Sequence, residues 1–269
     1  MKRLAIASSL IAVAASVASA QTAPVVSISR LPCGTNAAPT NVGQRFSDTY
    51  AFNGLMVQLT YSCYAIRHGD DYMIWDAGNP VGSAPIAPKS SLTDLLAEGH
   101  VAPQEVKYLA ISHYHADHTG QANQFPQATL LIGKADWDVI TDPKTMAAMT
   151  APFTPWISGG GKVEPLTGDK DVFGDGTVMM LNTPGHTPGH HSLLVRLKDM
   201  GNVLITGDLA HFQENYDANG VPTFNTDRAA SLASLDRFKK IAQGLKATVV
   251  IQHDQRDVGK LPVFPAAAK

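Results

Sequence analysis

His113-Tyr114-His115-Ala116-Asp117-His118 is the stretch of this sequence that decides the fold. It follows the apolar run at residues 106–111, which is typical of a short buried strand. Histidine nitrogen and carboxylate oxygen atoms suit zinc and similar divalent metals. Neither cysteine of the chain is near this stretch, which argues against a cysteine-rich structural zinc site. The stretch therefore predicts metal ligands at the end of a strand.

Three further candidate ligands stand alone later in the chain, each after an apolar strand or the turn that follows one: His186, Asp208 and His253. Taken alone, a histidine in such a place is more often hydrogen-bonded scaffolding than a ligand. With the first stretch, however, the chain offers seven ligands, more than the three that one catalytic zinc needs. Seven suit two divalent ions, most simply zinc, about 3.5–4 Å apart and sharing one carboxylate.

Apolar runs and helical patterns alternate along the rest of the chain. We expect strands at 55–66, 72–75, 106–111, 129–132, 178–181, 192–197, 203–206 and 248–252, and helices at 92–98, from 135 and at 227–245. Hairpin-like strands mixed with helices predict an α/β fold of stacked sheets covered by helices. We expect one domain over residues 21–269, with the irregular stretch 142–162 as a loop and candidate lid.

The 113–118 stretch resembles the HxHxDH signature of the metallo-β-lactamase superfamily, and other elements of that family follow in order. Residues 75–78 resemble its early Asp-x-Gly turn, residues 183–190 its Gly-His-Thr-x-Gly-His segment, and residues 206–208 its bridging-aspartate turn. The resemblance implies an αββα sandwich of two mixed β-sheets flanked by helices. It implies one metal held by His113, His115 and His186, a second held by Asp117, His118 and His253, and Asp208 between them.

Histidines and carboxylates outside that ligand set receive other roles. We expect Asp76, His190 and His191 to orient ligands or to form turns, because ligand side chains need oriented partners. His68 and His100 lie in turn-like segments and are expected to face solvent.

The residues after Asp208 narrow the resemblance to N-acyl homoserine lactonases. The segment 211–216 (HFQENY) and the terminal Val263-Phe264-Pro265 resemble those enzymes. An aspartate at the bridging position is also found in glyoxalase II and phosphodiesterases, whereas true β-lactamases of this fold generally lack it. One position departs from the lactonase pattern, because a tyrosine commonly stands three residues after the bridging aspartate and this chain has His211.

The resemblance implies a hydrolase that opens a lactone ring with a hydroxide bridging two metals. Asp117 would help to move a proton to the leaving alkoxide, and His211 would donate a hydrogen bond to the substrate oxygen. The substrate would be a small amphiphilic lactone. Candidate walls for its acyl tail are Phe52, Met56, Met149, Phe153 and Trp156, for which core packing is an equal alternative.

Two other functions remain open at the level of the sequence. The same scaffold and metal pair suit another esterase or an organophosphate hydrolase. A protein of a different class, a non-catalytic periplasmic metal-binding protein, would explain the ligands but not an aspartate at the bridging position.

The first twenty residues predict export. Lys2 and Arg3 precede an apolar stretch at 4–17 and small residues at 18–20, the pattern of a secretory signal peptide cleaved near Ala20. That stretch is shorter than the roughly 20 residues that span a bilayer, so we expect a periplasmic or secreted protein without membrane insertion.

Export also bears on the cysteines. Two cysteines in an oxidising compartment favour a disulfide between Cys33 and Cys63, the alternatives being two buried thiols or metal ligands. A formal net charge of −2 offers nothing that attracts nucleic acid. The sequence leaves the oligomeric state open, with a homodimer among the options.

Overall fold

The computed structural model describes residues 24–43, 45–83 and 88–269. The expected signal peptide, residues 1–20, lies outside the described residues. Within those residues, no helix combines the length and the apolar character needed to cross a membrane.

The first sheet has six strands in the order β1-β4-β5-β6-β7-β8. Its strands are β1 (Val26–Thr35), β4 (Thr60–His68), β5 (Asp71–Trp75), β6 (Val106–Ala110), β7 (Thr129–Gly133) and β8 (Val163–Leu166). β1, β4 and β5 pair antiparallel, whereas β5 to β8 pair in parallel, so the sheet is mixed. The carboxyl ends of the parallel strands therefore meet at one edge.

The second sheet is also mixed, with five strands in the order β13-β12-β11-β10-β9. Its strands are β9 (Lys170–Asp171), β10 (Val178–Asn182), β11 (His191–Leu197), β12 (Gly201–Ile205) and β13 (Thr248–Val250), of which only β12 and β13 pair in parallel. β2 (Thr40–Asn41) and β3 (Met56–Val57) form a separate pair.

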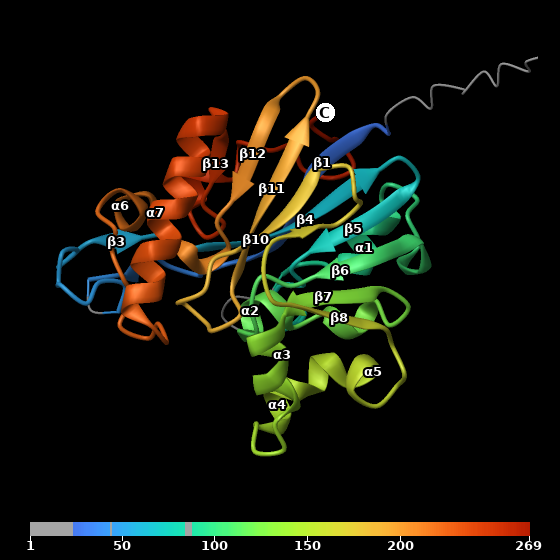
Figure 1. Cartoon of the computed structure of the whole chain (residues 1–269), viewed down its shortest axis with the longest axis horizontal. Coiled ribbons are helices and arrows are strands. Elements are labelled where there is room, and N and C mark those ends of the chain that lie inside the picture. The colour runs from blue at the N-terminus through green and yellow to red at the C-terminus, as the bar shows by residue number, and fades with distance from the viewer. Residues whose placement is uncertain (1–23, 44, 84–87) are drawn as a thin grey trace, which may run out of the picture.

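The helices are short, apart from one. The α-helices are α1 (Leu92–Ala97), α2 (Ala116–Thr119), α3 (Lys134–Thr141), α4 (Ala147–Thr150), α5 (Thr154–Ile157), α6 (Gln213–Asp217) and α7 (Arg228–Leu245). The 3-10 turns are η1 (Pro103–Glu105), η2 (Ala122–Gln124), η3 (Ala151–Phe153), η4 (Gly207–Leu209) and η5 (Gln255–Asp257). Figure 1 shows the two sheets in the centre of the molecule, with α7 on one side and α1 and α3 to α5 on the other.

Alternating side chains explain this layering. In β4, Tyr64 and Ile66 pack into the core between the two sheets, whereas Cys63 and Ala65 face the core on the other side of the sheet. Successive residues of a strand point to opposite faces, so a strand buried on both faces joins two cores. Leu204 of β12 likewise contacts the cluster beneath α7. The expected αββα sandwich is confirmed.

Capping residues define the two helices that the sequence predicts most clearly. The Asp227 side chain accepts a hydrogen bond from the Ala230 N–H at the start of α7. Ser91 and Asp94 form a reciprocal capping box at the start of α1. Each satisfies backbone N–H groups that the first helical turn leaves without partners. Both predicted helices are therefore confirmed within about two residues at each end.

Residues 142–162 differ from the expected loop. They contain α4, η3 and α5, and Phe153 and Trp156 are buried in the core against the first sheet. The Trp156 Nε1–H donates to the carbonyl oxygen of Ala128 at 3.0 Å, which fixes this segment to the body of the domain. The expectation of an irregular lid was wrong, because helices of four residues are too short to show a periodic apolar pattern.

A disulfide joins the neighbouring strands β1 and β4 through Cys33 and Cys63, whose Cα atoms are 5.9 Å apart. The sulfur atoms pack against Gly78, where a Cβ atom would lie 2.7 Å from Sγ of Cys33. Gly78 also has a φ of +55°, which favours glycine. The disulfide thus lies directly against the turn that follows β5.

Candidate metal centre and active site

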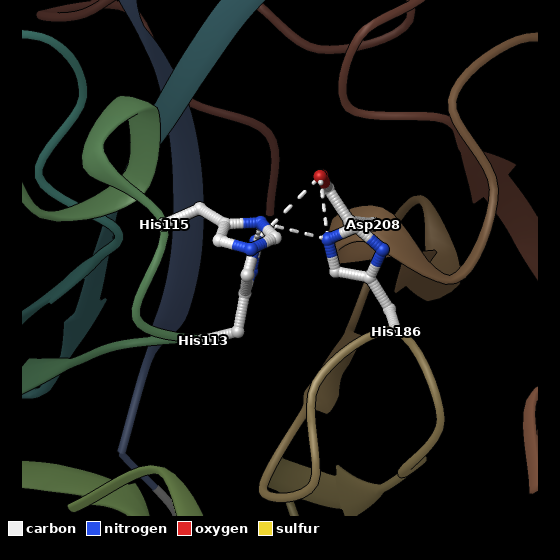
Figure 2. A group of neighbouring side chains, drawn as sticks. All are labelled: His113, His115, His186 and Asp208. Carbon is white, nitrogen blue, oxygen red and sulfur yellow. Dashed lines mark hydrogen bonds and ion pairs between the residues drawn. The ribbon is translucent and has the colours of Figure 1, made fainter. Parts of the chain in front are cut away.

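The seven predicted ligands lie together at the strand ends. They form two groups, His113, His115, His186 and Asp208, and Asp117, His118, Asp208 and His253, and within each group the ligand atoms lie within 4.8 Å of one another. The first group is shown in Figure 2, where two histidines from the loop after β6 face His186 and Asp208 from the second sheet. The site is therefore built at the edge where both sheets end.

Asp208 belongs to both groups, and its two oxygen atoms face different ways. Oδ2 lies 3.2 Å from Nε2 of His186 and 3.6 Å from Nε2 of His113. Oδ1 lies 3.0 Å from Nε2 of His118 and 2.8 Å from Nε2 of His253. A carboxylate placed in this way can bind one cation through each oxygen, as the shared ligand of a two-metal site does.

Three of the histidines are fixed by hydrogen bonds from their outer ring nitrogen. Nδ1 lies 2.8 Å from Asp76 Oδ2 in His118, 2.8 Å from Asn225 Oδ1 in His186 and 2.8 Å from the carbonyl oxygen of Thr60 in His253. Because these oxygens accept hydrogen bonds, Nδ1 carries a proton and Nε2 is the nitrogen that faces the centre. This is the arrangement in which a neutral histidine binds a metal.

The distances within the first group also fit a metal. Nδ1 of His115 lies 2.9 Å from Nε2 of His113 and 2.9 Å from Nε2 of His186. Nitrogens bound to one tetrahedral zinc at about 2.0–2.1 Å are about 3.3 Å apart. Three nitrogen atoms at such a spacing, together with a carboxylate, match the donor set that zinc and similar ions take.

Electrostatics keep two of the histidines and the shared aspartate in their binding forms. Burial lowers the pKa of His113 well below its usual value, and burial lowers the pKa of His115 to about 4. Burial raises the pKa of Asp208, but the surrounding histidines outweigh it and hold that pKa well below its usual range. At neutral pH the two histidines are neutral and the aspartate is ionised, as metal binding requires. For His118 and His253 burial lowers the pKa, but nearby carboxylates, Asp208 first, outweigh it and raise the pKa, so each of these two must lose a proton when it binds a metal.

Residues behind the ligands have the expected supporting roles. Asp76 accepts hydrogen bonds from the Ser112 N–H at 2.7 Å and from Gln252 Nε2 at 2.7 Å, besides its contact with His118. His190 Nε2 accepts from the Asp208 N–H at 2.9 Å, which fixes the backbone of the shared ligand. His68 differs from expectation, since it stacks on Phe173 at 4.1 Å and pairs with Asp175 at 2.7 Å rather than facing solvent.

Asp136 is a supporting residue that sequence reasoning missed. It is buried at the start of α3, where it accepts hydrogen bonds from Thr187 Oγ at 2.7 Å and from the Gly189 N–H at 2.6 Å. Burial raises its pKa to about 6, although hydrogen bonds from Thr187, Gly189 and the Tyr114 backbone lower it in part. Asp136 thus ties together the two loops that carry His115 and His186. A lone aspartate in a helix gives no sequence signal of this role.

A cavity of about 550 Å³ opens beside the ligands. Its floor is formed by His115, Ala116, Asp117, Asp208, His211 and His253, and its walls by Asn36, Thr40, Arg45, Phe46, Leu59, Tyr61 and Phe224. The wall residues come mainly from the segment between β1 and β4. The cavity therefore combines a candidate metal centre with polar and aromatic walls, as small-molecule sites do.

The five predicted wall residues lie elsewhere. Phe52 packs on Phe212 at 5.3 Å in the hydrophobic cluster that also contains the wall residues Phe46 and Leu59, but Phe52 itself is not among the lining residues, and Met56 is exposed on β3. Phe153 and Trp156 are core residues, and Met149 lies on α4 beside them. The structure thus favours the core-packing alternative for Phe52, Phe153 and Trp156, because an aromatic side chain has the same sequence appearance in a core as in a pocket.

His211 does line the cavity, and it is buried beside Asp208. Its backbone N–H donates to Asn215 Oδ1 at 3.0 Å, and its Nε2 lies 3.1 Å from Asp208 Oδ2. Nδ1 is buried and has no hydrogen-bond partner among the described residues. Burial lowers the pKa of His211, so the ring is neutral at pH 7.

Comparisons with known proteins agree with this geometry. A model of the metallo-beta-lactamase superfamily matches residues 57–253, and the chain belongs to that superfamily. An N-acyl homoserine lactonase AttM from Rhizobium johnstonii is 30% identical over 234 residues, which cover 75% of this chain and 84% of the relative.

Solved structures are similar in fold. A quorum-quenching N-acyl homoserine lactone lactonase aligns with a TM-score of 0.76 at 22% identity, covering 91% of this chain and all of that chain. AidC, a dizinc quorum-quenching lactonase in complex with a product, aligns with a TM-score of 0.66 at 16% identity, covering 92% of this chain and 95% of that one.

Proposed function

We propose that this chain is a metal-dependent hydrolase that opens the lactone ring of N-acyl homoserine lactones. The proposal rests chiefly on the placement of Asp208. Its two oxygens face two separate groups of ligands on the floor of the cavity. The names of the relatives support the choice of substrate. The superfamily fold alone would not support this choice of substrate, because one fold supports many reactions.

The proposed cofactor is a pair of divalent ions, most simply zinc. His113, His115, His186 and Asp208 would hold one ion, and Asp117, His118, His253 and Asp208 the other. Two such ions supply the nucleophile by lowering the pKa of a water molecule, and they polarise the scissile carbonyl.

The protein side chains supply orientation and proton transfer. His211 lies beside Asp208 in the cavity, where its one N–H, on Nε2 and 3.1 Å from Asp208 Oδ2, would be shared with the lactone carbonyl oxygen as negative charge develops on it. The Asp117 carboxylate also lines the cavity, and its side chain keeps 29% of its surface exposed. A carboxylate that reaches the substrate can carry a proton to the leaving alkoxide.

A substrate panel tests this function. Purified, zinc-loaded protein is assayed with N-hexanoyl homoserine lactone, a phosphotriester, a simple aryl ester and a β-lactam, with Asp208→Ala as the control. We expect kcat/KM to be highest for the lactone and to fall to background in the control. Preferred turnover of the phosphotriester or the aryl ester would show that the chain is another kind of hydrolase and not a lactonase. No turnover of any substrate would favour a metal-binding protein without catalysis.

We further propose that the chain is exported and cleaved near Ala20. The amino-terminal sequence supports this proposal, since a basic start, an apolar stretch and small residues define a signal peptide. Expression of the full sequence in a bacterial host, followed by amino-terminal sequencing of the periplasmic fraction, should find a chain beginning at Gln21. Recovery only of an unprocessed cytoplasmic chain would overturn it.

A further inference from the structure

The wall of the cavity beside the metal ligands carries a strong hydrogen-bond donor. Arg45 is the one lysine or arginine among the described lining residues, and its side chain is exposed. In the described part of the chain its guanidinium makes no ion pair and donates no hydrogen bond. An arginine side chain offers five N–H donors in a rigid planar fork, so Arg45 can donate a hydrogen bond to a ligand in the cavity that it lines.

The position of this guanidinium is set by Phe224. Cζ of Arg45 lies 4.9 Å from the centre of the Phe224 ring, a cation–π contact. The same ring lies 5.6 Å from the His186 ring and 5.8 Å from the His211 ring. The backbone is fixed too, because Thr223 donates to the Arg45 carbonyl oxygen from its N–H at 2.8 Å. The Phe224 ring therefore contacts Arg45 as well as two histidines of the candidate site, which places Arg45 close to that site.

The other polar groups of this wall already have partners. The Tyr61 hydroxyl donates to Asn36 Oδ1 at 3.0 Å, and Asn36 Nδ2 donates to Thr40 Oγ at 2.7 Å. This local network leaves Arg45 as the wall residue with a charged donor and no protein acceptor among the described residues. A plain alkyl chain lying there would displace water from the guanidinium and return no hydrogen bond, which is unfavourable.

We propose that Arg45 determines acyl specificity by donating a hydrogen bond to an oxygen atom carried by the acyl chain. The inference rests on the proposed lactonase function, in which the lactone ring lies over the metal ligands and the acyl group extends toward the wall. The preferred substrates are lactones with a carbonyl oxygen on the acyl chain, such as 3-oxoacyl derivatives, rather than those with unsubstituted chains of the same length.

The test compares N-(3-oxohexanoyl) and N-hexanoyl homoserine lactone on zinc-loaded enzyme. The measured quantity is the ratio of the two kcat/KM values, which does not depend on the fraction of enzyme that is folded or active. We expect a ratio of about 10 for the unaltered protein, the effect of one hydrogen bond from a charged donor. Arg45→Met should bring the ratio to about 1–2, since it keeps a long apolar stem without the donors.

Arg67→Met is the matched control, because Arg67 is also exposed and lies 5.9 Å over the ring of Tyr72, but it does not line this cavity. Its ratio should equal that of the unaltered protein. A ratio near 1 in the unaltered protein, or an unchanged ratio in Arg45→Met, would overturn the role of Arg45 while leaving the lactonase intact. Failure of the unaltered enzyme to open either lactone would overturn the proposed function and this inference with it.

Discussion

Nε2 of His211 lies 3.1 Å from Oδ2 of Asp208, the same oxygen that faces His186. A neutral imidazole has one N–H, and a carboxylate at this distance favours placing that proton on Nε2. His211 therefore orients the shared aspartate while it lines the cavity. This contact links a candidate metal ligand, Asp208, to His211, which stands where lactonases commonly have a tyrosine.

Replacement of His211 should impair catalysis more than metal binding. We expect His211→Ala to lower kcat/KM for a lactone by about 10- to 1,000-fold, the upper part of the range being the cost of one lost oxyanion donor. Metal content should remain near that of the unaltered protein, because all seven ligands are still present. His211→Tyr should recover part of the activity. Loss of metal from the alanine variant would instead make His211 a ligand or an essential support of one.

Asp136 should matter for metal affinity although it contacts no ligand side chain. In Asp136→Asn, one carboxylate oxygen becomes an NH₂ group. If that group faces Gly189, the N–H of Gly189 loses its acceptor, and if it faces Thr187, the hydroxyl must turn from donor to acceptor, so the link between the ligand loops is weakened. We expect zinc affinity, measured by competition with a chelator, to fall by about 10- to 100-fold. Asp138→Asn on the same helix is the control, because Asp138 is exposed and, among the described residues, pairs only with Lys134. Equal affinities in the two variants would show that Asp136 is not a positioning residue.

The buried carboxyl group of Asp136 should also make the stability of the fold depend on pH. Burial raises the pKa of folded Asp136 to about 6, whereas an unfolded aspartate titrates near 4. The folded state thus binds more protons between these values, so this group makes the fold less stable as pH rises through that window. Urea unfolding of metal-free protein should show a loss on the order of 1 kcal/mol from pH 5 to 7 that is absent in Asp136→Asn. Identical slopes in both proteins would refute the shifted pKa.

The disulfide should contribute stability through the unfolded chain. Cys33 and Cys63 are 30 residues apart, and closing a loop of this length stabilises a fold by about 3 kcal/mol. The Cys33→Ser, Cys63→Ser double variant should unfold at lower urea concentration and with a larger m-value, because its unfolded chain is less compact. Intact mass under non-reducing conditions gives an independent check, and two free thiols in protein from an oxidising compartment would contradict the pairing.

The sequence predicts the metal-ligand cluster better than the cavity, for a physical reason. Histidines and aspartates at strand ends are few, and the resemblance to a known superfamily implies which of them lie together. Phe153 and Trp156 have no such constraint, because an apolar side chain packs equally well against a sheet or a substrate. Their burial depends on where α5 docks, which is a tertiary contact.

The polar cavity walls could not be foreseen for a similar reason. Asn36, Thr40 and Arg45 precede the family motif by many residues and have no characteristic spacing. They reach the cavity because the segment between β1 and β4 is held to the rest of the domain, as in the contact between Arg45 and Thr223. Long-range hydrogen bonds of this kind leave no local pattern in a sequence.

The metal content of the purified protein tests the shared role of Asp208 most directly. Elemental analysis should find close to two divalent ions per chain, because the two ligand groups meet at this carboxylate. Asp208→Ala should lose at least one ion together with lactone hydrolysis, since two nearby cations would then lack the negative charge that offsets their repulsion. A single stable ion per chain with full activity, or an alanine variant that keeps both ions and its turnover, would contradict the two-metal site.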